Sequence, residues 1–342
     1  MTDHPRIGAR ATIAAGTALA LAACSGTTAA VAPSDEPAEP TPVSIVLDWT
    51  PNTNHSGLYL ALANGWYEDA GLDVTVIEPG ETSGLQLLAA GQADFAYSVA
   101  EGLLPARAAG ADVVSVAAVI EHNTSSLLSL TEDGIERPRD LEGKRYGSYG
   151  SGLEEAIISS LVACDGGDPA LVEHTPLVSN DFRIGLTQDQ FDAAWVFDAW
   201  DTVRLGEVDD LDVSTIAFRD WFECIPDWYT PLLATSAEHI EAAPDTVSAF
   251  VDVTARGYAA AMDDPQAAAD ALMAAAPELD EELVAASTRW LADQYSETPE
   301  AWGVQQESTW TEFSQWLADG DILNGDPEVD GAWTNDFLTA QQ

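Results

Sequence analysis

Residues 43–65 read VSIVLDWTPNTNHSGLYLALANG, and this stretch predicts the unit from which the fold is built. Residues 43–47 form an apolar run of strand length, and residues 57–64 have the apolar spacing of a helix. The loop between them contains a Trp, several amides and a His. With the N–H groups of a helix N-terminus, these side chains can bind a flat polar ring. Alternatively, the Pro and Asn residues only shape and cap the turn, and Trp49 packs in the core.

Strands and helices alternate along the rest of the chain in the same way. Such alternation predicts α/β lobes with largely parallel sheets, in which ligands bind beyond the carboxyl ends of the strands. In the first series we expect strands at residues 43–47, 73–77, 93–97 and 113–120 and helices at 57–64, 83–91 and 100–110. In the second we expect strands at 144–148, 191–197 and 213–218 and a helix at 153–164. Beyond Tyr229 we expect Ala-rich helices that pack back on the first lobe, at 244–262, 265–275, 281–294 and 304–317.

The charge balance excludes one class of partner. The 342 residues include 58 acidic and 12 basic side chains, which gives a formal net charge of −46. Strong attraction to nucleic acid or to anionic lipid is therefore not expected. A hydrophobic content of 46%, with 11 Trp, 8 Tyr and 9 Phe, is enough for a large folded core. We interpret the acidity as an adaptation to an external or salty medium.

The N-terminal segment has the pattern of an export signal. Two arginines precede an apolar run at residues 11–23, which is shorter than the ~20 residues of a membrane-spanning helix. The run ends in Leu-Ala-Ala-Cys24, which resembles a bacterial lipobox. We expect residues 1–23 to be a signal peptide, Cys24 to be lipidated, and the Pro-rich residues 24–42 to form a tether on the outer face of the cell membrane. The alternative is an ordinary signal peptide with a chance Cys.

The remaining cysteines allow two interpretations. If Cys24 is lipidated, Cys164 and Cys224 are an even pair in an exported chain, and they form either a disulfide or two separate buried thiols. Neither these cysteines nor the five scattered His residues have the spacing of metal ligands. No metal site is therefore expected.

Residues 146–155 read YGSYGSGLEE, which predicts a strand, a Gly-rich turn and a helix. Ser151 and Glu154 fit an S-x-x-E capping box, which leaves Tyr149 able to face a cleft. The glycines match neither of the usual nucleotide-phosphate motifs. This segment therefore predicts a turn at a ligand site and no phosphate-binding loop.

Residues 192–201 read DAAWVFDAWD and predict the end of another strand. Alternation places Trp195 and Phe197 on one face, with Asp198 and Trp200 just past the strand end. We expect Phe197 to pack in the core and Trp200 to line a cleft.

These motifs together resemble those of the NMT1/THI5-like substrate-binding proteins, and in particular of the ThiY-type members. The resemblance spans about residues 43–338. It implies a type II periplasmic-binding-protein-like fold, in which two α/β lobes are joined by two crossings and a ligand binds between them. The implied boundaries are residues 43–130 for the first lobe, 131–228 for the second and 229–342 for the return to the first. The segments that carry the resemblance are 48–55, 57–59, 65–67, 71–73, 91–95, 143–147, 150–156, Trp310, Trp316 and 333–337.

The resemblance also implies the residues that bind the ligand. Aromatic faces would stack on a ring, while carboxylates and amides would select it. Asp198 and Tyr149 stand where relatives often carry other residues, which leaves the identity of the ring open. The implied residues are Trp49, Asn52, His55, Tyr97 and Glu101 in the first lobe, Tyr149, Trp195, Asp198 and Trp200 in the second, and Tyr229 near the return crossing.

The implied function is delivery of a thiamin pyrimidine precursor, of the formylaminopyrimidine or hydroxymethylpyrimidine type, to the permease and ATPase of an ABC transporter. Riboflavin is a second candidate ligand, because flavin-binding relatives share the fold. The superfamily also contains pyrimidine synthases that use pyridoxal phosphate on a Lys and an active-site His. Here the segment after Asp94 has neither residue, and the one lysine, Lys144, is expected at the surface. We therefore expect a monomeric binding protein with no cofactor and no catalytic residues.

Overall fold

The computed structural model describes residues 39–179, 181–323 and 325–338. The predicted signal peptide, the lipidation site at Cys24 and most of the tether lie outside the described residues. The first strand begins at Thr41, so the predicted tether ends before residue 42. The described residues form one compact unit.

The first sheet has five strands, β1 (Thr41–Val46), β2 (Leu72–Ile77), β3 (Phe95–Ser98), β4 (Val114–Ala118) and β10 (Leu232–Thr235). Their order is β2-β1-β3-β10-β4. β1 pairs in parallel with β2 and β3, whereas β10 is antiparallel to β3 and β4. Because β10 lies between strands from the first part of the chain, the returning chain completes the middle of this sheet.

The second sheet also has five strands, β5 (Ser125–Leu130), β6 (Arg145–Ser148), β7 (Glu173–Pro176), β8 (Ala193–Phe197) and β9 (Val213–Ala217). Their order is β7-β6-β8-β5-β9, and β5 is antiparallel to both of its neighbours. β6 pairs in parallel with β7 and β8. The chain therefore passes between the sheets twice, once between β4 and β5 and once between β9 and β10, which confirms two α/β lobes with two crossings.

Two lobe boundaries can be compared with these strands. The first lobe is predicted to extend to residue 130, but β5 already pairs within the second sheet, so the first crossing falls between β4 and β5. The predicted boundary at residue 228 falls inside the segment between β9 and β10.

β5, β7 and β10 are not predicted at all. β5 mixes buried Ser and Leu on both faces, and β7 is a short polar strand at the sheet edge, so neither shows apolar alternation.

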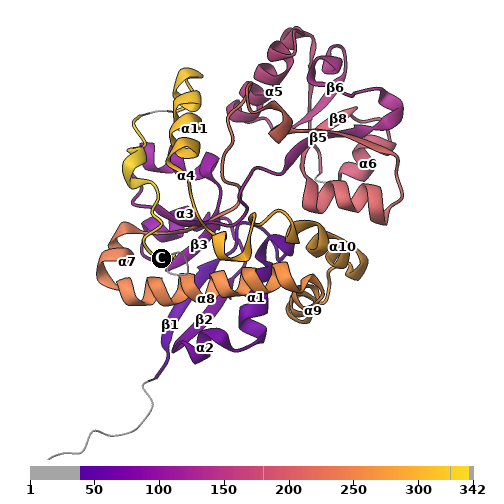
Figure 1. The fold of residues 1–342 in the computed structure, drawn as a ribbon. Coiled ribbons are helices and arrows are strands. Elements are labelled where there is room, and N and C mark those ends of the chain that lie inside the picture. Colours follow the sequence, from indigo (N-terminus) through magenta and orange to yellow (C-terminus); the bar gives the residue numbers. More distant parts are fainter. Residues whose placement is uncertain (1–38, 180, 324, 339–342) are drawn as a thin grey trace, which may run out of the picture. The chain divides into compact units, whose positions relative to one another are not determined.

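Helices cover the first sheet. They are α1 (Ser56–Ala63), α2 (Trp66–Asp69), α3 (Gly84–Ala89), α4 (Ala100–Ala108), α7 (Ala237–Ala242), α8 (Pro244–Asp263), α9 (Pro265–Ala275), α10 (Glu281–Ala292) and α11 (Glu307–Asp319). Figure 1 shows the long helix α8 with α1 and α9 beside it. The C-terminal helices thus pack on the first lobe as predicted, and α8 and α9 both begin at a proline, which favours the first helical position.

The second sheet carries fewer helices, α5 (Gly152–Cys164) and α6 (Phe182–Thr187). After β8 the chain forms two π-helical turns, Asp198–Thr202 and Arg204–Val208. Such turns are rare and often occur at functional sites. The first of them follows directly from the carboxyl end of a strand, which is where the sequence predicts ligand contacts.

Glycines allow α1 and α8 to approach each other closely. A Cβ atom at Gly257 would lie 2.1 Å from the backbone oxygen of Gly57. A Cβ atom at Gly57 would lie 2.4 Å from the ring of Tyr258. The loop that precedes α1 is therefore positioned by a contact that only glycine permits.

Gly257→Ala should lower the free energy of unfolding by at least about 1–3 kcal/mol, because the added methyl group overlaps fixed backbone atoms. Urea denaturation of the purified protein measures the change. Gly152→Ala is a matched control, since a Cβ atom there meets nothing within 4 Å. Equal stability of the two variants would contradict the described packing.

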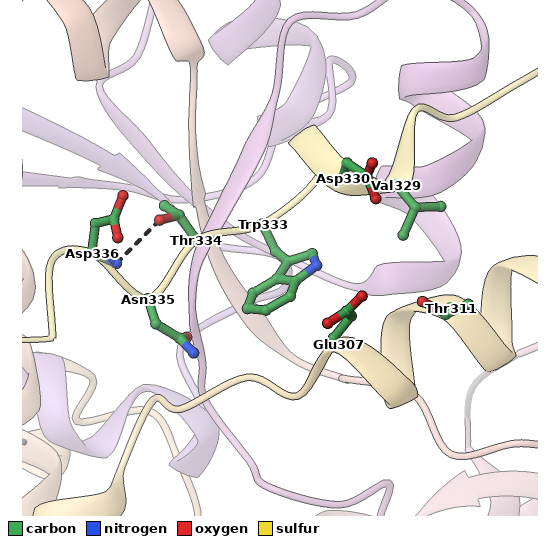
Figure 2. Close-up of a pocket in the computed structure, with 8 residues that line it drawn as sticks. All are labelled: Glu307, Thr311, Val329, Asp330, Trp333, Thr334, Asn335 and Asp336. Atoms are coloured by element: carbon green, nitrogen blue, oxygen red, sulfur yellow. Dashed lines mark hydrogen bonds between the residues drawn. The ribbon is translucent and has the colours of Figure 1, made fainter.

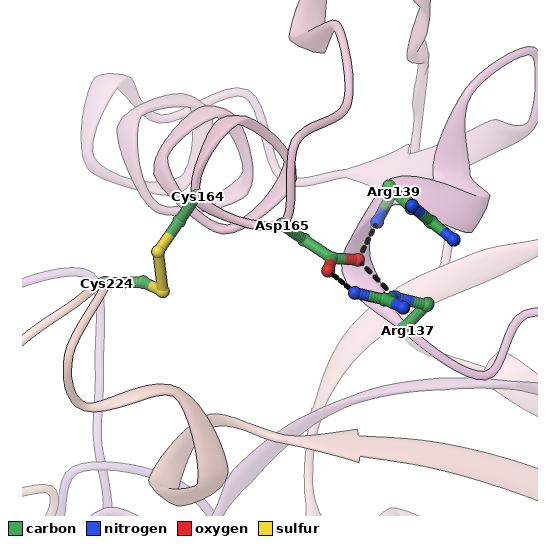
Figure 3. The surroundings of a disulfide bond; sticks show 5 residues. All are labelled: Arg137, Arg139, Cys164, Asp165 and Cys224. Carbon is green, nitrogen blue, oxygen red and sulfur yellow. Dashed lines mark hydrogen bonds and ion pairs between the residues drawn. A yellow bond between two sulfur atoms is a disulfide. The ribbon is translucent and has the colours of Figure 1, made fainter.

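A disulfide joins Cys164, at the end of α5, to Cys224 in the return crossing, with 5.8 Å between the Cα atoms. The two interpretations left open by the sequence are thereby decided in favour of the bond. Next to it, Asp165 accepts hydrogen bonds from the guanidinium of Arg137 and from the backbone N–H of Arg139 (Figure 3). The bond ties the second lobe to the crossing over a separation of 60 residues.

Replacing both Cys164 and Cys224 by Ser should destabilise the protein by up to about 4 kcal/mol, because the unfolded chain is no longer closed into a loop. The melting temperature of the wild type should fall on reduction, whereas that of the double variant should not respond to reductant. Alkylation of Cys164 or Cys224 in the unreduced, unfolded wild type, located by peptide mass spectrometry, would show that the bond is not formed.

Candidate functional site

Three large aromatic side chains are exposed where strands of the two sheets end. Trp49, after β1, is 58% exposed, Tyr149, after β6, is 51% exposed, and Phe197, the last residue of β8, is 39% exposed. The prediction that Phe197 packs in the core is wrong, because β8 ends at this residue and its side chain projects beyond the packed layer. Its neighbour Trp195 is buried, with a ring distance of 6.4 Å between the two.

The loop after β1 is organised by a buried histidine. His55 is fully buried, and its Nδ1 accepts a hydrogen bond from the backbone N–H of Asn52 at 3.3 Å. Nε2 therefore carries the proton and donates to Asp48 Oδ1 at 2.8 Å. Asn52 caps the same turn, because its side-chain oxygen accepts from the backbone N–H of Asn54 at 2.9 Å.

Asp48 lies in the candidate site but is not among the predicted ligand-binding residues. Its side chain is 22% exposed while that of its partner His55 is fully buried. The imidazole thus holds one carboxylate oxygen. The signal was present in the sequence, since Asp48 immediately precedes Trp49 in the quoted motif.

Tyr97 supports this loop from inside the first lobe. The structure buries it, and its hydroxyl lies 2.8 Å from that of Tyr258, which in turn donates to the backbone oxygen of Asn54 at 2.6 Å. The His55 ring packs edge-on against the Tyr97 ring at 4.7 Å. Tyr97 therefore reaches the loop through these two partners, from the core.

Glu101 lies in the first turn of α4, directly after β3. Its Oε2 is buried and makes no hydrogen bond, and neither does the buried indole nitrogen of Trp228. Burial raises the pKa of Glu101 to about 8, opposed in part by its own backbone N–H and by Trp228, and helped by the negative charge of Asp48. The carboxyl group of Glu101 is thus mostly protonated at pH 7.

Asp227 ties the two crossings together. One of its oxygens accepts from the backbone N–H groups of Asn123 at 3.0 Å and Trp228 at 2.9 Å, and the other lies 2.7 Å from His122 Nδ1. The interaction with Asp227 raises the pKa of His122. The side chain of Asp227 on the return crossing is therefore bonded to the first crossing at His122 and Asn123.

Most of the buried polar atoms without a partner gather at these crossings. Among the described residues, nine buried side-chain N or O atoms make no hydrogen bond, and six of them lie on the crossings or next to them. Because a buried polar group without a partner is costly, these atoms are candidates for hydrogen bonds to another molecule. The six belong to Glu101, Asn123, Ser125, Trp195, Trp228 and Thr230.

Trp195 and Trp228 connect the second lobe to the return crossing. Their rings meet edge-on at 6.1 Å, and Trp228 stacks on Phe313 of α11 at 5.1 Å. The backbone oxygen of Trp195 accepts a hydrogen bond from the Tyr149 hydroxyl at 3.4 Å. Glu101, Trp228, Trp195 and Tyr149 thereby form a continuous series of neighbours from one lobe to the other.

The turn that presents Tyr149 is built around a buried carboxylate. Glu154 accepts hydrogen bonds from the hydroxyl groups of Tyr146 and Ser148 at 2.8 and 2.9 Å, and from the backbone N–H groups of Tyr149 and Gly150 at 3.0 and 2.9 Å. The predicted capping box is only half formed. Ser151 caps the helix by accepting from the Glu154 N–H at 3.1 Å, but the Glu154 side chain turns to the preceding residues instead.

Glu154→Gln should lower the free energy of unfolding by about 3 kcal/mol, because an amide NH₂ would face donors where a carboxylate oxygen now accepts. Glu155→Gln, the exposed neighbour in the same first turn, is the matched control and should have little effect. Thermal denaturation compares the two, and an equal loss in both variants would rule out the described role of Glu154.

Asp198 and Trp200 lie on the π-helical turn after β8. Asp198 is buried and accepts from the hydroxyl groups of Ser126 at 2.7 Å and Thr202 at 2.8 Å. Burial raises its pKa, partly offset by these two bonds and by Arg219. Trp200 is half-buried and packs against apolar residues of α9 and α10. Asp201, which was not predicted, is also held in this turn, and burial raises its pKa to about 7.

Tyr229 is buried behind the site. Its hydroxyl accepts from the backbone N–H of Gln306 at 2.7 Å, and its backbone oxygen accepts from the N–H of Ala100 at 2.9 Å. It therefore fixes the start of α4, next to Glu101, through its backbone.

A separate pocket of about 470 Å³ lies between α11 and the C-terminal segment. Figure 2 shows the Trp333 indole beside Glu307, with Asp330 and Asp336 further along the same segment. None of the predicted ligand-binding residues lines it. The candidate site is therefore defined by the strand ends and crossings.

Within residues 39–179, 181–323 and 325–338, no group of three or more His, Cys, Asp or Glu side chains could hold a metal ion. Over the same ranges, no helix is both long and apolar enough to cross a bilayer.

Two mixed sheets joined by two crossings define the class of the fold, a type II periplasmic-binding-protein fold. The aliphatic sulphonate-binding protein SsuA of Escherichia coli superposes with a TM-score of 0.67 at 15% identity, over 86% of this chain and 92% of that one. SsuA of Xanthomonas axonopodis pv. citri, solved with MOPS, gives a TM-score of 0.65 at 19% identity, over 87% and 99%.

The chain belongs to the NMT1/THI5-like family, whose pattern matches residues 52–268. It is 28% identical over 315 residues to the formylaminopyrimidine-binding protein of Halalkalibacterium halodurans. This alignment covers 89% of this chain and 92% of that protein. It is 23% identical over 302 residues to the 4-amino-5-hydroxymethyl-2-methylpyrimidine phosphate synthase of Legionella pneumophila, covering 86% and 92%. The family thus includes proteins named as binders and proteins named as synthases.

Proposed function

We propose that this protein is the extracytoplasmic solute-binding component of an ABC importer and binds a thiamin pyrimidine precursor, of the formylaminopyrimidine or hydroxymethylpyrimidine type, between its lobes. The observation that carries the proposal is the exposure of Trp49, Tyr149 and Phe197 at strand ends of both sheets. Exposed aromatic surfaces next to unpartnered buried polar atoms suit a flat ring with polar edges. The similarity to the formylaminopyrimidine-binding protein supports this choice of ring.

Ligand binding in this proposal closes the two lobes around the ring. Trp49 approaches from the first lobe and Tyr149 from the second, and stacking on an aromatic ring adds ~0.5–1.5 kcal/mol beyond the burial of area. The ligand drives closure only as far as it binds the closed state better than the open one. The crossings, joined at Asp227, are the natural hinge for such a motion.

The proposed membrane attachment rests on Cys24 and on the Pro-rich segment that follows it. A multiply acylated cysteine supplies the two anchoring signals that lasting attachment requires. The acidic, folded body would then remain outside the cell, held near the permease with which it works. We expect it to act as a monomer and without a cofactor.

A synthase is the second candidate, because several relatives carry that name. A Schiff base to pyridoxal phosphate requires an amine. The one lysine of the sequence, Lys144, donates from Nζ to the backbone oxygen of Asp133 at 2.6 Å and precedes β6, whereas Tyr149 follows the other end of that strand. These residues do not fit that cofactor at the candidate site, which favours the binding function. Absorbance of a Schiff base after addition of pyridoxal phosphate, lost in Lys144→Ala, would favour the synthase.

Thermal denaturation with candidate ligands tests the proposal. The purified protein is mixed in turn with formylaminopyrimidine, 4-amino-5-hydroxymethyl-2-methylpyrimidine, thiamin and riboflavin. A true ligand at a hundred times its Kd should stabilise the fold by about 2.7 kcal/mol. Stabilisation by riboflavin alone would replace the pyrimidine by a flavin, and no response to any of the four would contradict the proposal.

Trp49→Ala should weaken the binding of the pyrimidine about tenfold, because one stacking face is lost. Titration calorimetry measures the affinity. Trp66→Ala is the control, because Trp66 lies before β2, with Arg256 over its ring at 3.7 Å, away from the strand ends that carry the site. Unchanged affinity in Trp49→Ala would remove the indole from the site.

A further inference from the structure

Glu101 differs from the other carboxyl groups of the candidate site in how little the protein offers its charge, since only its own backbone N–H and the Trp228 indole oppose the effect of burial. Its Oε2 is buried without a hydrogen bond. The charged group that faces it is Asp48, in the loop after β1, and from the return crossing it is faced by the uncharged indole of Trp228. Among the described residues, no Lys, Arg or His forms an ion pair with it. An anion at this position would be costly, so the position selects the neutral acid.

The neighbouring carboxyl groups each accept hydrogen bonds from other side chains. Asp198 accepts two hydroxyl hydrogen bonds, and Asp48 accepts from His55. Glu154 accepts from two hydroxyl groups and two backbone N–H groups. Each of these groups is stabilised as an acceptor by the protein itself. In Glu101, by contrast, the buried Oε2 makes no hydrogen bond, and only its own backbone N–H and the Trp228 indole favour a charge.

A neutral carboxyl group offers one donor and one acceptor side by side, whereas a carboxylate offers only acceptors. The matching edge on a ligand is a ring nitrogen, which accepts, next to an exocyclic amino group, which donates. An aminopyrimidine has such an edge. A carboxylate at the same place would face the lone pair of the ring nitrogen and repel it.

We propose that Glu101 binds the ligand as a carboxylic acid, donating a hydrogen bond to a pyrimidine ring nitrogen and accepting one from the adjacent amino group. This inference rests on the proposed function and names the chemical feature that the site selects. Asp48, held by His55, has the complementary role of keeping the proton on Glu101 through its negative charge. Trp228 lies beside the acid on the crossing and limits its orientation.

The inference fixes the sign of the pH dependence. Burial and the charge of Asp48 raise the pKa of Glu101 to about 8 in the free protein. Below that pH the proton needed in the complex is already present, and above it the proton must be taken up on binding. The affinity should therefore be constant between about pH 6.5 and 7.5 and fall about tenfold per pH unit above about pH 8.

Glu101→Gln provides the decisive variant, because an amide has nearly the shape of the neutral acid and also presents a donor group, its NH₂, beside an acceptor oxygen. It should bind 4-amino-5-hydroxymethyl-2-methylpyrimidine within about threefold of the wild type at pH 7 and lose the decline above pH 8. Glu101→Ala should bind about ten to a hundred times more weakly at every pH. Glu281→Gln, an exposed acid in the first turn of α10, is the control and should keep the wild-type profile.

Calorimetry of the wild type in buffers of different ionisation enthalpy gives a second readout that needs no variant. Uptake of close to one proton per ligand is expected at pH 9 and close to none at pH 6.5. A pyrimidine without the 4-amino group should bind the wild type about ten to a hundred times more weakly, because the carbonyl oxygen of Glu101 would lose its donor.

Several outcomes would overturn the inference. Affinity that rises with pH, or that is lost in Glu101→Gln as fully as in Glu101→Ala, would mean that Glu101 acts as an anion. Wild-type binding with no proton uptake at pH 9 and no effect of Glu101→Ala would remove Glu101 from the site while the proposed function stands. Failure of the wild type to bind any aminopyrimidine would overturn the proposed function itself, and the inference with it.

Discussion

The hydrogen bond from the buried ring of His55 to Asp48 is the interaction on which the rest of the candidate site depends. The backbone N–H of Asn52 fixes which imidazole nitrogen carries the proton, and the other nitrogen then holds the carboxylate at the strand end. Beneath the ring, Tyr97 and Tyr258 secure the same loop to the core. The Asp48 carboxylate, next to Trp49 in the sequence, is thus held at a fixed position. Part of its surface remains free of protein contacts.

The two crossings are held by strong contacts, and they also contain buried polar atoms without hydrogen-bond partners. Asp227 and the Cys164–Cys224 disulfide connect them firmly to each other and to the second lobe. Yet the same segments carry most of the buried polar atoms that lack a partner among the described residues. In the proposed function, a ligand that binds beside the crossings would provide hydrogen-bond partners for some of these atoms.

The sequence anticipated much of the fold and a smaller part of the site. Helices with proline starts and strands with apolar runs were predicted nearly where they lie, because each depends on neighbours in the chain. β5 and β7 were missed, since they are recognisable only by what they pair with. Of the predicted site residues, Trp49 and Tyr149 are exposed at strand ends, whereas Tyr97 and Tyr229 lie in the interior. Asp48, Trp228 and Asp201 were not predicted.

By itself, the sequence determined the α/β alternation, the strand–loop–helix unit at residues 43–65 and the aromatic, acidic character of the strand ends. Only the tertiary structure decided that Cys164 meets Cys224, that Phe197 is exposed, and that Glu154 accepts from four donors while Oε2 of Glu101 is buried without a hydrogen bond. The physical reason is that periodicity and capping act between residues a few positions apart. Burial, partners and pKa values depend on which distant segments the folded chain brings together.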